Sequence, residues 1–299
     1  MLSVKHLAKN FGTLKAVQNL SFEIKDGEIL GLVGQNGSGK TTTFRMLLGL
    51  MQPTAGKVLW NCEKIGEKQK DLIGYLPEER GLYPKETIEQ QVMYFGKLRG
   101  KAPREIKENL DYWMDHLQVK GKKNDRIKSL SKGNQQKVQL ITTLIHEPKL
   151  VILDEPFSGL DPVNAQIMQD AIIALRKQGS CVIFSSHNMA NVEQICDRLV
   201  MIKDGRQVLA GKVQDIKDSF GKIKVFLESP LTTAEVQAVP GVVAVKERGR
   251  RLEVTLSDPA AGRELFELAT KDGYIPTFSQ ETLTLEEIFK LKAGEKDEL

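Results

Sequence analysis

The amino-acid sequence predicts an α/β protein whose core is a parallel sheet covered by helices, followed by a small α+β domain. Strand-like runs at Leu150–Leu153 and Cys181–Ser185 are separated by a helical stretch at Asn164–Gln178, an alternation typical of a parallel sheet. A glycine-rich loop follows another apolar run, at Ile29–Val33. Near Gly221 the pattern changes to short alternating strands and helices. We therefore expect two domains, which suits a chain of 299 residues.

The first domain is expected to begin with an antiparallel element. Between residues 2 and 32, short β-rich segments are broken by turn residues at Asn10–Gly12 and Lys25–Gly27. After the glycine-rich loop, the apolar residues of segment 40–48 fall on one face of a helix, which Gly49 ends. The expected order is therefore strand, loop, helix.

Residues 86–147 have a different character and predict a helical insertion. Ile106 and Leu110 belong to a series of apolar residues at helical spacing, and Val138 and Ile141 belong to a second series. Because strand-like runs resume at residue 150, this helical subdomain interrupts the sheet rather than following it.

The last part of the chain resembles a small α+β module with an antiparallel sheet. We place the boundary at about Gly221, so the expected domains are residues 1–220 and 221–299. Strands are expected near 223–227, 242–246, 252–256 and 275–279, and helices near 233–239, 263–271 and 285–291.

Composition excludes several classes of protein. The formal net charge is +4, with 27 % charged and 40 % hydrophobic residues, which is ordinary globular composition and indicates no nucleic-acid partner. No apolar run is long enough to span a bilayer, and residues 1–15 lack the apolar core of a signal peptide. The three cysteines are scattered and form no C-x-x-C pair. We expect a cytoplasmic protein.

Residues 34–41 carry the clearest chemical signal. They read Gly-Gln-Asn-Gly-Ser-Gly-Lys-Thr and match G-x-x-x-x-G-K-S/T between a buried strand and the start of a helix. Glycines let successive N–H groups point at phosphate oxygens, Lys40 would reach the β- and γ-phosphates, and Thr41 would offer its hydroxyl to Mg²⁺. The expected ATP-binding residues here are Gly34, Asn36, Gly37, Ser38, Gly39, Lys40, Thr41 and Thr42.

Two acidic residues follow the apolar run at Leu150–Leu153. A parallel strand would deliver Asp154 and Glu155 to the same edge of the sheet as the phosphate loop. Asp154 would hold Mg²⁺ through its water shell. Glu155 is placed to orient or deprotonate an attacking water, as a general base must be. With Lys40 and Thr41, these residues predict ATP hydrolysis.

The sequence resembles the ATP-binding subunit of an ABC transporter, and the resemblance covers residues 2–215. A further motif lies between the glycine-rich loop and the acidic pair. Leu-Ser-Lys-Gly-Asn at 130–134 is similar to the LSGGQ signature of that family, although Lys132 and Asn134 depart from it. In the family, the signature at a helix N-terminus contacts the γ-phosphate of ATP bound by the opposite protomer. The resemblance assigns this role in trans to Ser131, Gly133 and Asn134.

The resemblance implies roles for four further residues. Asp161, after Ser-Gly-Leu, matches the family's D-loop at the dimer seam, and His187, after two serines, matches the switch histidine that contacts the γ-phosphate. Phe11 stands where an aromatic stacks on adenine, while a core phenylalanine is the alternative interpretation. Glu78 occupies the position of the Q-loop glutamine; it keeps an oxygen ligand for Mg²⁺, and its role in sensing the γ-phosphate stays open.

The resemblance implies that the chain is an ATP-hydrolysing motor subunit. It would close as a homodimer, or as a heterodimer with another ABC ATPase, around ATP and Mg²⁺, and drive a separate transmembrane permease from the inner face of the cell membrane. Residues 75–83 and the appended C-terminal module resemble the export branch, which handles drugs, sodium or peptides. The alternative is a soluble ABC ATPase acting on ribosomes or nucleic acid, which a single cassette disfavours. A non-hydrolysing regulatory subunit is disfavoured by Glu155 and His187.

Overall fold

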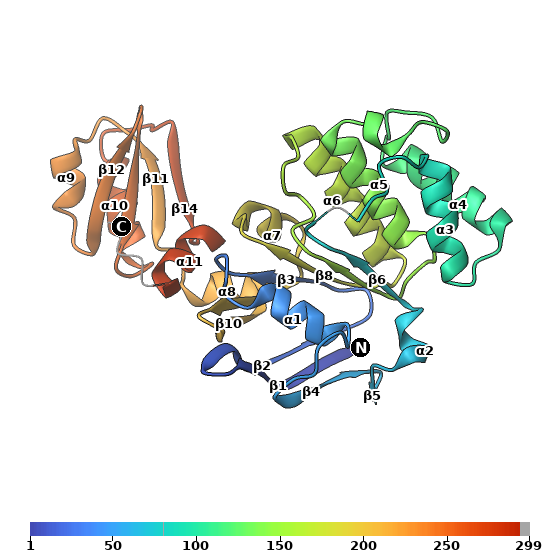
Figure 1. Cartoon of the computed structure of the whole chain (residues 1–299). Helices are drawn as coiled ribbons and strands as arrows, with labels where there is room; N and C mark the ends of the chain where they lie inside the picture. Colours follow the sequence, from blue (N-terminus) through green and yellow to red (C-terminus); the bar gives the residue numbers. More distant parts are fainter. Residues whose placement is uncertain (80, 294–299) are drawn as a thin grey trace. The chain divides into compact units, whose positions relative to one another are not determined.

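The computed structural model describes residues 1–79 and 81–293. Arg80, which belongs to the segment 75–83 discussed above, lies outside the described residues. The chain divides into two compact units, Met1–Gly211 and Lys212–Leu299, whose elements are labelled in Figure 1. Each unit is described by itself. Among the described residues, none of the helices is long and apolar enough to cross a membrane.

In the described part of the first unit, ten strands form one sheet in the order β5-β4-β1-β2-β10-β9-β3-β8-β7-β6. Its first part is antiparallel: β1 pairs with β2 from Leu2↔Ile24 and with β4 from Leu2↔Trp60. Antiparallel pairing after residue 2 is what the turn residues predicted. The bounds are β1 (Leu2–Phe11), β2 (Leu14–Ile24), β4 (Ala55–Trp60) and β5 (Glu63–Lys64), with the short helix α2 (Glu67–Lys70) following.

The second part of this sheet is parallel and positions the site. Strand β3 pairs in parallel with β8 and β9, β8 with β7, and β7 with β6 (Figure 1). Every residue of β3, β7 and β8 is buried, as expected for strands covered on both faces. The bounds are β3 (Ile29–Val33), β6 (Ile73–Leu76), β7 (Leu150–Leu153), β8 (Cys181–Ser186), β9 (Arg198–Lys203) and β10 (Arg206–Lys212). The loops after β3, β6, β7 and β8 therefore leave the same edge of the sheet.

Helices α1, α6 and α7 follow β3, β7 and β8, and side-chain caps begin the last two. Asp161 and Asn188 cap α6 and α7 by accepting a hydrogen bond from a backbone N–H of the first turn. Pro162 stands at the first position of α6, where its missing N–H costs nothing. The bounds are α1 (Lys40–Leu47), α6 (Pro162–Lys177) and α7 (Met189–Ile195).

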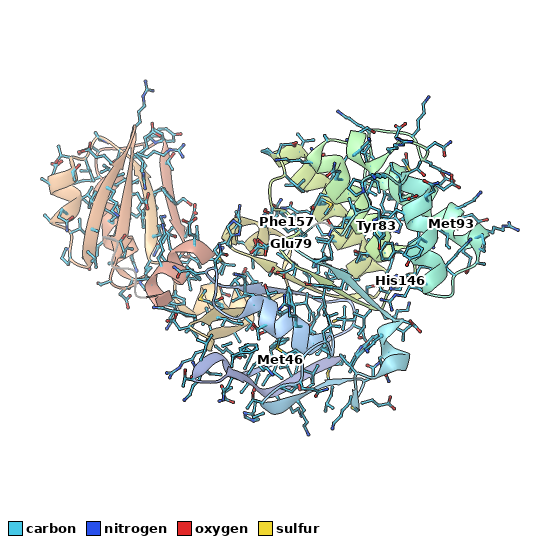
Figure 2. The ribbon with its side chains drawn as sticks, viewed as in Figure 1. Met46, Glu79, Tyr83, Met93, His146 and Phe157 are labelled. Atoms are coloured by element: carbon cyan, nitrogen blue, oxygen red, sulfur yellow. The ribbon has the colours of Figure 1, made fainter. Side chains whose placement is uncertain are left out.

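The helical insertion consists of α3 (Ile88–Leu98), α4 (Pro103–His116), a 3-10 turn η1 (Ile127–Ser129) and α5 (Lys132–Leu144). It matches the insertion predicted for residues 86–147. Thr87 and Gln90 form a capping box at the start of α3. Figure 2 shows Tyr83 and Met93, both labelled, in this part of the molecule.

The second unit has a four-stranded antiparallel sheet, in the order β12-β13-β11-β14 among its described residues. Its core contains Val225, Leu227, Val254 and Leu265, and buried Lys224 forms ion pairs with Glu253 and Glu287. The bounds are α8 (Val213–Ser219), β11 (Lys224–Glu228), α9 (Thr233–Gln237), β12 (Val242–Arg248), β13 (Arg251–Leu256), α10 (Ala261–Ala269), β14 (Thr277–Glu281) and α11 (Leu285–Ala293).

The two units meet between Gly211 and Lys212, whereas the sequence places a boundary at about Gly221. Helix α8 lies between these two points. The boundary from the sequence stays a prediction, because only an excised fragment tests where an independently folding domain ends.

We predict that a fragment of residues 1–221, which contains both candidate boundaries, folds by itself because its apolar core is its own. Both tryptophans, Trp60 and Trp113, lie in this fragment, so their fluorescence during urea denaturation follows its unfolding. The expected result is a single cooperative transition close to that of the full chain. An insoluble fragment, or one without a cooperative transition, would show that the two units depend on one another to fold.

Candidate nucleotide-binding site

The glycine-rich loop between β3 and α1 curls tightly, and glycine is required where it does so. Gly39 caps α1 with φ +107°, and a Cβ atom there would lie 2.5 Å from the Ala16 carbonyl oxygen. A Cβ at Gly34 would lie 2.3 Å from the Ile202 carbonyl oxygen. This close approach of backbone to backbone leaves no space for larger residues.

Lys40, at the start of α1, is folded against the loop. Its side chain is only 6 % exposed, and Nζ donates to the carbonyl oxygens of Gly34 at 2.7 Å and Gln35 at 3.2 Å. Burial lowers the pKa of Lys40 below its usual value, while the carboxylates of Glu155 and others nearby act in the opposite direction. A desolvated ammonium in this position can exchange its carbonyl partners for phosphate oxygens, which bind it more strongly.

Asp154 follows β7 and connects three elements of the sheet edge. Its Oδ2 accepts a hydrogen bond from Thr41 Oγ1 at 3.2 Å, and its Oδ1 accepts one from Ser185 Oγ at 2.6 Å. Ser185 Oγ in turn accepts from the Glu155 backbone N–H at 2.8 Å. Ser185 therefore fixes both acidic residues. In the sequence Ser185 is only the last residue of an expected strand, and no local signal marks its role.

Glu155 is held in an uncommon conformation. Its φ is +48°, in the left-handed region, and its side chain is 8 % exposed. Oε2 accepts a hydrogen bond from His187 Nδ1 at 2.9 Å, whereas Oε1 is buried without a hydrogen-bond partner among the described residues. Phe157, labelled in Figure 2, packs edge-to-face on Phe184 of β8 with ring centroids 5.5 Å apart and supports the turn. A buried carboxylate oxygen with a free lone pair is a ready proton acceptor.

These residues surround a cavity of about 430 Å³, which is within the range of small-molecule sites. Phe11 lies at its rim, 47 % exposed rather than in the core, with Lys9 Nζ 5.3 Å from the ring centroid. Leu14 and Ala16, which the sequence analysis did not name, also line the cavity. Of the residues expected from the sequence, the lining contains Phe11, Asn36, Gly37, Gly39, Lys40, Thr41, Thr42, Glu78, Asp154 and Glu155.

Gly34, Ser38 and His187 lie outside this lining. Gly34 acts through its carbonyl oxygen on Lys40, and His187 acts through Glu155. The His187 side chain is 63 % exposed, so its other ring nitrogen remains accessible. The Ser38 hydroxyl is buried with no hydrogen-bond partner within the described ranges.

The signature residues form a second cluster, away from the cavity lining. Ser131 caps α5 and accepts hydrogen bonds from Asn134 N at 3.3 Å and Asn134 Nδ2 at 3.2 Å. Asp161 caps α6 and accepts from both nitrogens of Asn164, whose backbone N–H holds the pKa of Asp161 below its usual value. Asn164, named from the sequence only as the start of a helical stretch, also lies against Gly133 and so connects the two helix starts.

The donor atoms beside the phosphate loop fit Mg²⁺. Thr41 Oγ1 and Asp154 Oδ2 are 3.2 Å apart, and both are the hard oxygen donors that Mg²⁺ prefers. In the part of the chain that the structure describes, no group of three or more His, Cys, Asp or Glu side chains could hold a metal by itself.

Comparisons with known proteins agree with this geometry. A family model described as ABC transporter matches residues 17–158, and one described as the C-terminal domain of DrrA1-3-like ATP-binding proteins matches residues 211–293. ABC transporter ATP-binding protein YhaQ of Bacillus subtilis (strain 168) is 40 % identical over 98 % of this chain and 99 % of its own length. Nod factor export ATP-binding protein I of Rhizobium sp. (strain N33) is 32 % identical over 84 % of each chain. The solved structure of the ATP-binding subunit of an ABC transporter is similar with a TM-score of 0.68 and 29 % identity, covering 74 % of this chain and 93 % of that one.

We predict that Ser185→Ala lowers the free energy of unfolding by about 2 kcal/mol, because it leaves the Glu155 N–H and an Asp154 oxygen without a buried partner. Ser180→Ala is the matched control: it removes one buried bond, to the Pro148 carbonyl, and should cost about 1 kcal/mol. Urea denaturation followed by tryptophan fluorescence compares them. A Ser185→Ala cost equal to or below that of the control would show that Ser185 does not hold the acidic pair.

Proposed function

Since this chain belongs to the ATP-binding proteins of ABC transporters, we propose that it hydrolyses ATP in the cavity beside Lys40 and thereby powers a separate transmembrane permease as part of an exporter. The observation that carries the proposal is that Glu155, whose Oε1 is buried without a hydrogen-bond partner among the described residues, lines a cavity together with Lys40, Thr41 and Asp154. A proton acceptor beside a phosphate-binding loop and a metal-binding hydroxyl is what hydrolysis of a phosphoanhydride needs.

Binding of ATP is assigned to the glycine-rich loop. Its backbone N–H groups and the N-terminus of α1 would hold the phosphates, and Lys40 would contact the β- and γ-phosphates. Phe11, exposed at the cavity rim, would stack on the adenine ring. Thr41 and Asp154 would hold Mg²⁺, with Glu78 on the same side. When bound, Mg²⁺ neutralises charge on the phosphates.

Hydrolysis is assigned to Glu155 and His187. Glu155 would orient the attacking water and accept its proton at Oε1, because Oε2 is already engaged by His187. That hydrogen bond restrains the carboxylate. The exposed His187 side chain would contact the γ-phosphate through its other ring nitrogen, Nε2.

A second ATPase chain is proposed because the signature lies outside the cavity lining. Ser131, Gly133 and Asn134 at the start of α5, with Asp161 at the start of α6, would complete the site of an opposite protomer. The partner is either a second copy of this chain or another ABC ATPase. ATP would join the two chains, and loss of the γ-phosphate would release them.

Two similarities favour export. A relative of similar length is named as an export ATP-binding protein, and the second unit matches a family of C-terminal domains appended to ATP-binding proteins. We propose drugs, sodium or peptides as the class of cargo, as the sequence predicts, and a position at the inner face of the cell membrane. The cargo would be selected by the permease. Co-purification of the membrane protein that binds this chain tests this part of the proposal.

Glu155→Gln is expected to retain ATP binding and to lower the turnover number about 100-fold or more, because the amide cannot accept a proton while the phosphate loop is unchanged. Steady-state hydrolysis and ATP titration measure the two effects. Glu79→Gln is the control: the same change is made at an exposed residue outside the cavity lining, and turnover should equal that of the unmodified chain. Undiminished turnover of Glu155→Gln would reject Glu155 as the base.

If each ATP site is shared between two chains, two inactive variants should recover ATPase activity when they are mixed. Lys40→Ala and Ser131→Arg each damage one half of every site in a homodimer. In a mixed dimer, one site combines the intact loop with the intact signature. An equal mixture should therefore recover about a quarter of full activity if one site can act alone, since half of the dimers are mixed.

Two results together would contradict the proposal that the sites are shared between chains and that one site can act alone. These are activity of the mixture equal to the average of the separate variants, and ATP-induced dimer formation by the unmodified chain. Absence of an ATP-induced dimer would instead indicate that the natural partner is a different ATPase chain. Size-exclusion chromatography with ATP and Mg²⁺ provides this second measurement.

A further inference from the structure

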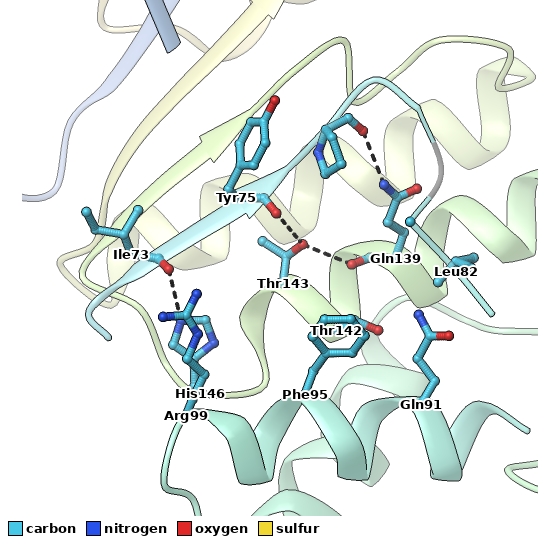
Figure 3. A pocket seen from close by; sticks show the side chains of 12 residues that line it. Ile73, Tyr75, Leu82, Gln91, Phe95, Arg99, Gln139, Thr142, Thr143 and His146 are labelled. Carbon is cyan, nitrogen blue, oxygen red and sulfur yellow. Dashed lines mark hydrogen bonds between the residues drawn. The ribbon is translucent and has the colours of Figure 1, made fainter. Parts of the chain in front are cut away.

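Polar side chains of α5, and of His146 just after its end, reach the carbonyl oxygens of β6 and of the residues following it. Gln139 Nε2 donates to the carbonyl oxygens of Pro77 at 3.1 Å and Glu79 at 3.3 Å. Thr143 Oγ1 lies 3.4 Å from that of Tyr75, and His146 Nε2 lies 3.2 Å from that of Ile73. Figure 3 shows this series of contacts along the strand.

The geometry of β6 explains why the acceptors are the carbonyl groups of alternate, odd-numbered residues. The Leu76 carbonyl oxygen accepts from Asp154 N at 2.8 Å, so the even-numbered carbonyl groups face β7 and the odd-numbered ones face away from it. Strand β6 is the last of the sheet, and the carbonyl groups of an edge strand need other donors. Gln139 and Thr143, one turn apart on α5, and His146, just after the end of the helix, supply them.

Gln139 differs from the other two because it contacts backbone beyond the strand. Its two acceptors flank Glu78, the residue that lines the nucleotide cavity. Both acceptors are carbonyl oxygens, so the amide orientation is fixed: nitrogen faces the loop, and Oε1 has no partner within the described residues. Gln139 is 4 % exposed, so its amide is buried against the loop.

Packing does not substitute for these hydrogen bonds. A cavity of about 260 Å³ lies between α5, α3 and this loop, and Pro77, Leu82, Phe95 and Gln139 are among the residues that line it (Figure 3). Further along the loop, the Tyr83 N–H donates to Gln91 Oε1 at 2.7 Å. Among the hydrogen bonds of the described residues, those that hold the backbone beside Glu78 to α5 come from the Gln139 amide.

We propose that Gln139 is a positioning residue that holds Glu78 at the nucleotide site and ties its position to that of α5. Helix α5 begins at the signature, with Ser131 as its cap, so a displacement of the signature end of the helix is transmitted to the backbone on both sides of Glu78. The assignment rests on the proposed function, in which Glu78 stands on the metal side of ATP.

The test compares the Mg²⁺ concentration needed for half-maximal ATP hydrolysis by full-length variants. Gln139→Met keeps the length and volume of the side chain but removes the donor, and it should raise that concentration roughly threefold to tenfold, the effect of one or two lost hydrogen bonds. ATP affinity measured without Mg²⁺ should not change. Thr142→Val is the matched control: Thr142 lines the same cavity, but its hydroxyl donates to the Val138 carbonyl within α5, so the Mg²⁺ requirement should stay unchanged.

A double substitution separates positioning of Glu78 from general support of the fold. Glu78→Ala should itself raise the Mg²⁺ requirement, Glu78→Gln less so, and Gln139→Met should add nothing in the Glu78→Ala background. An additive effect, or a Gln139→Met variant that titrates like Thr142→Val, would overturn the proposal. If Glu78→Ala leaves the titration unchanged, Glu78 is not on the metal side and the proposal falls with it, whereas hydrolysis by Glu155 is decided independently by Glu155→Gln.

Discussion

Parallel pairing of β6, β7, β8 and β3 is the constraint on which the whole site depends. It brings the carboxyl ends of four strands that are far apart in the sequence to one edge of the sheet. The register Leu153↔Phe184 sets Asp154 beside Ser185, and Val33↔Ser186 sets the glycine-rich loop beside both. A slip of one residue would turn the Asp154 side chain to the other face of the sheet and away from Thr41.

The same edge concentrates features that do not favour stability. Glu155 adopts a left-handed backbone conformation and keeps a buried oxygen unpaired among the described residues, each of which costs on the order of 1–3 kcal/mol. Lys40 is desolvated as well. The apolar strands β3, β7 and β8 offset these costs through their burial. Under the proposed function, these costly groups are the ones that would receive a phosphate, a metal ion and a water molecule.

Local signals made much of this structure predictable. The glycine pattern at 34–41, the helical insertion and the acidic pair after β7 could be recognised because each depends on neighbouring residues. Ser185 and Gln139 could not, because their partners lie 31 and 62 residues away and a buried polar residue in a strand or helix has no local signature. The positive φ of Glu155 could not be predicted either, because glutamate is not a residue type that indicates this backbone conformation.

Amide hydrogen exchange of the full-length chain, with and without ATP and Mg²⁺, tests the central claim most directly. If the loop after β3 holds the phosphates through its backbone N–H groups, ATP should slow exchange chiefly in residues 34–42, with the turn at 154–155 following once Mg²⁺ is present. Unchanged exchange in residues 34–42 at saturating ATP, or protection confined to residues 212–293, would contradict the assignment of this edge of the sheet as the nucleotide site.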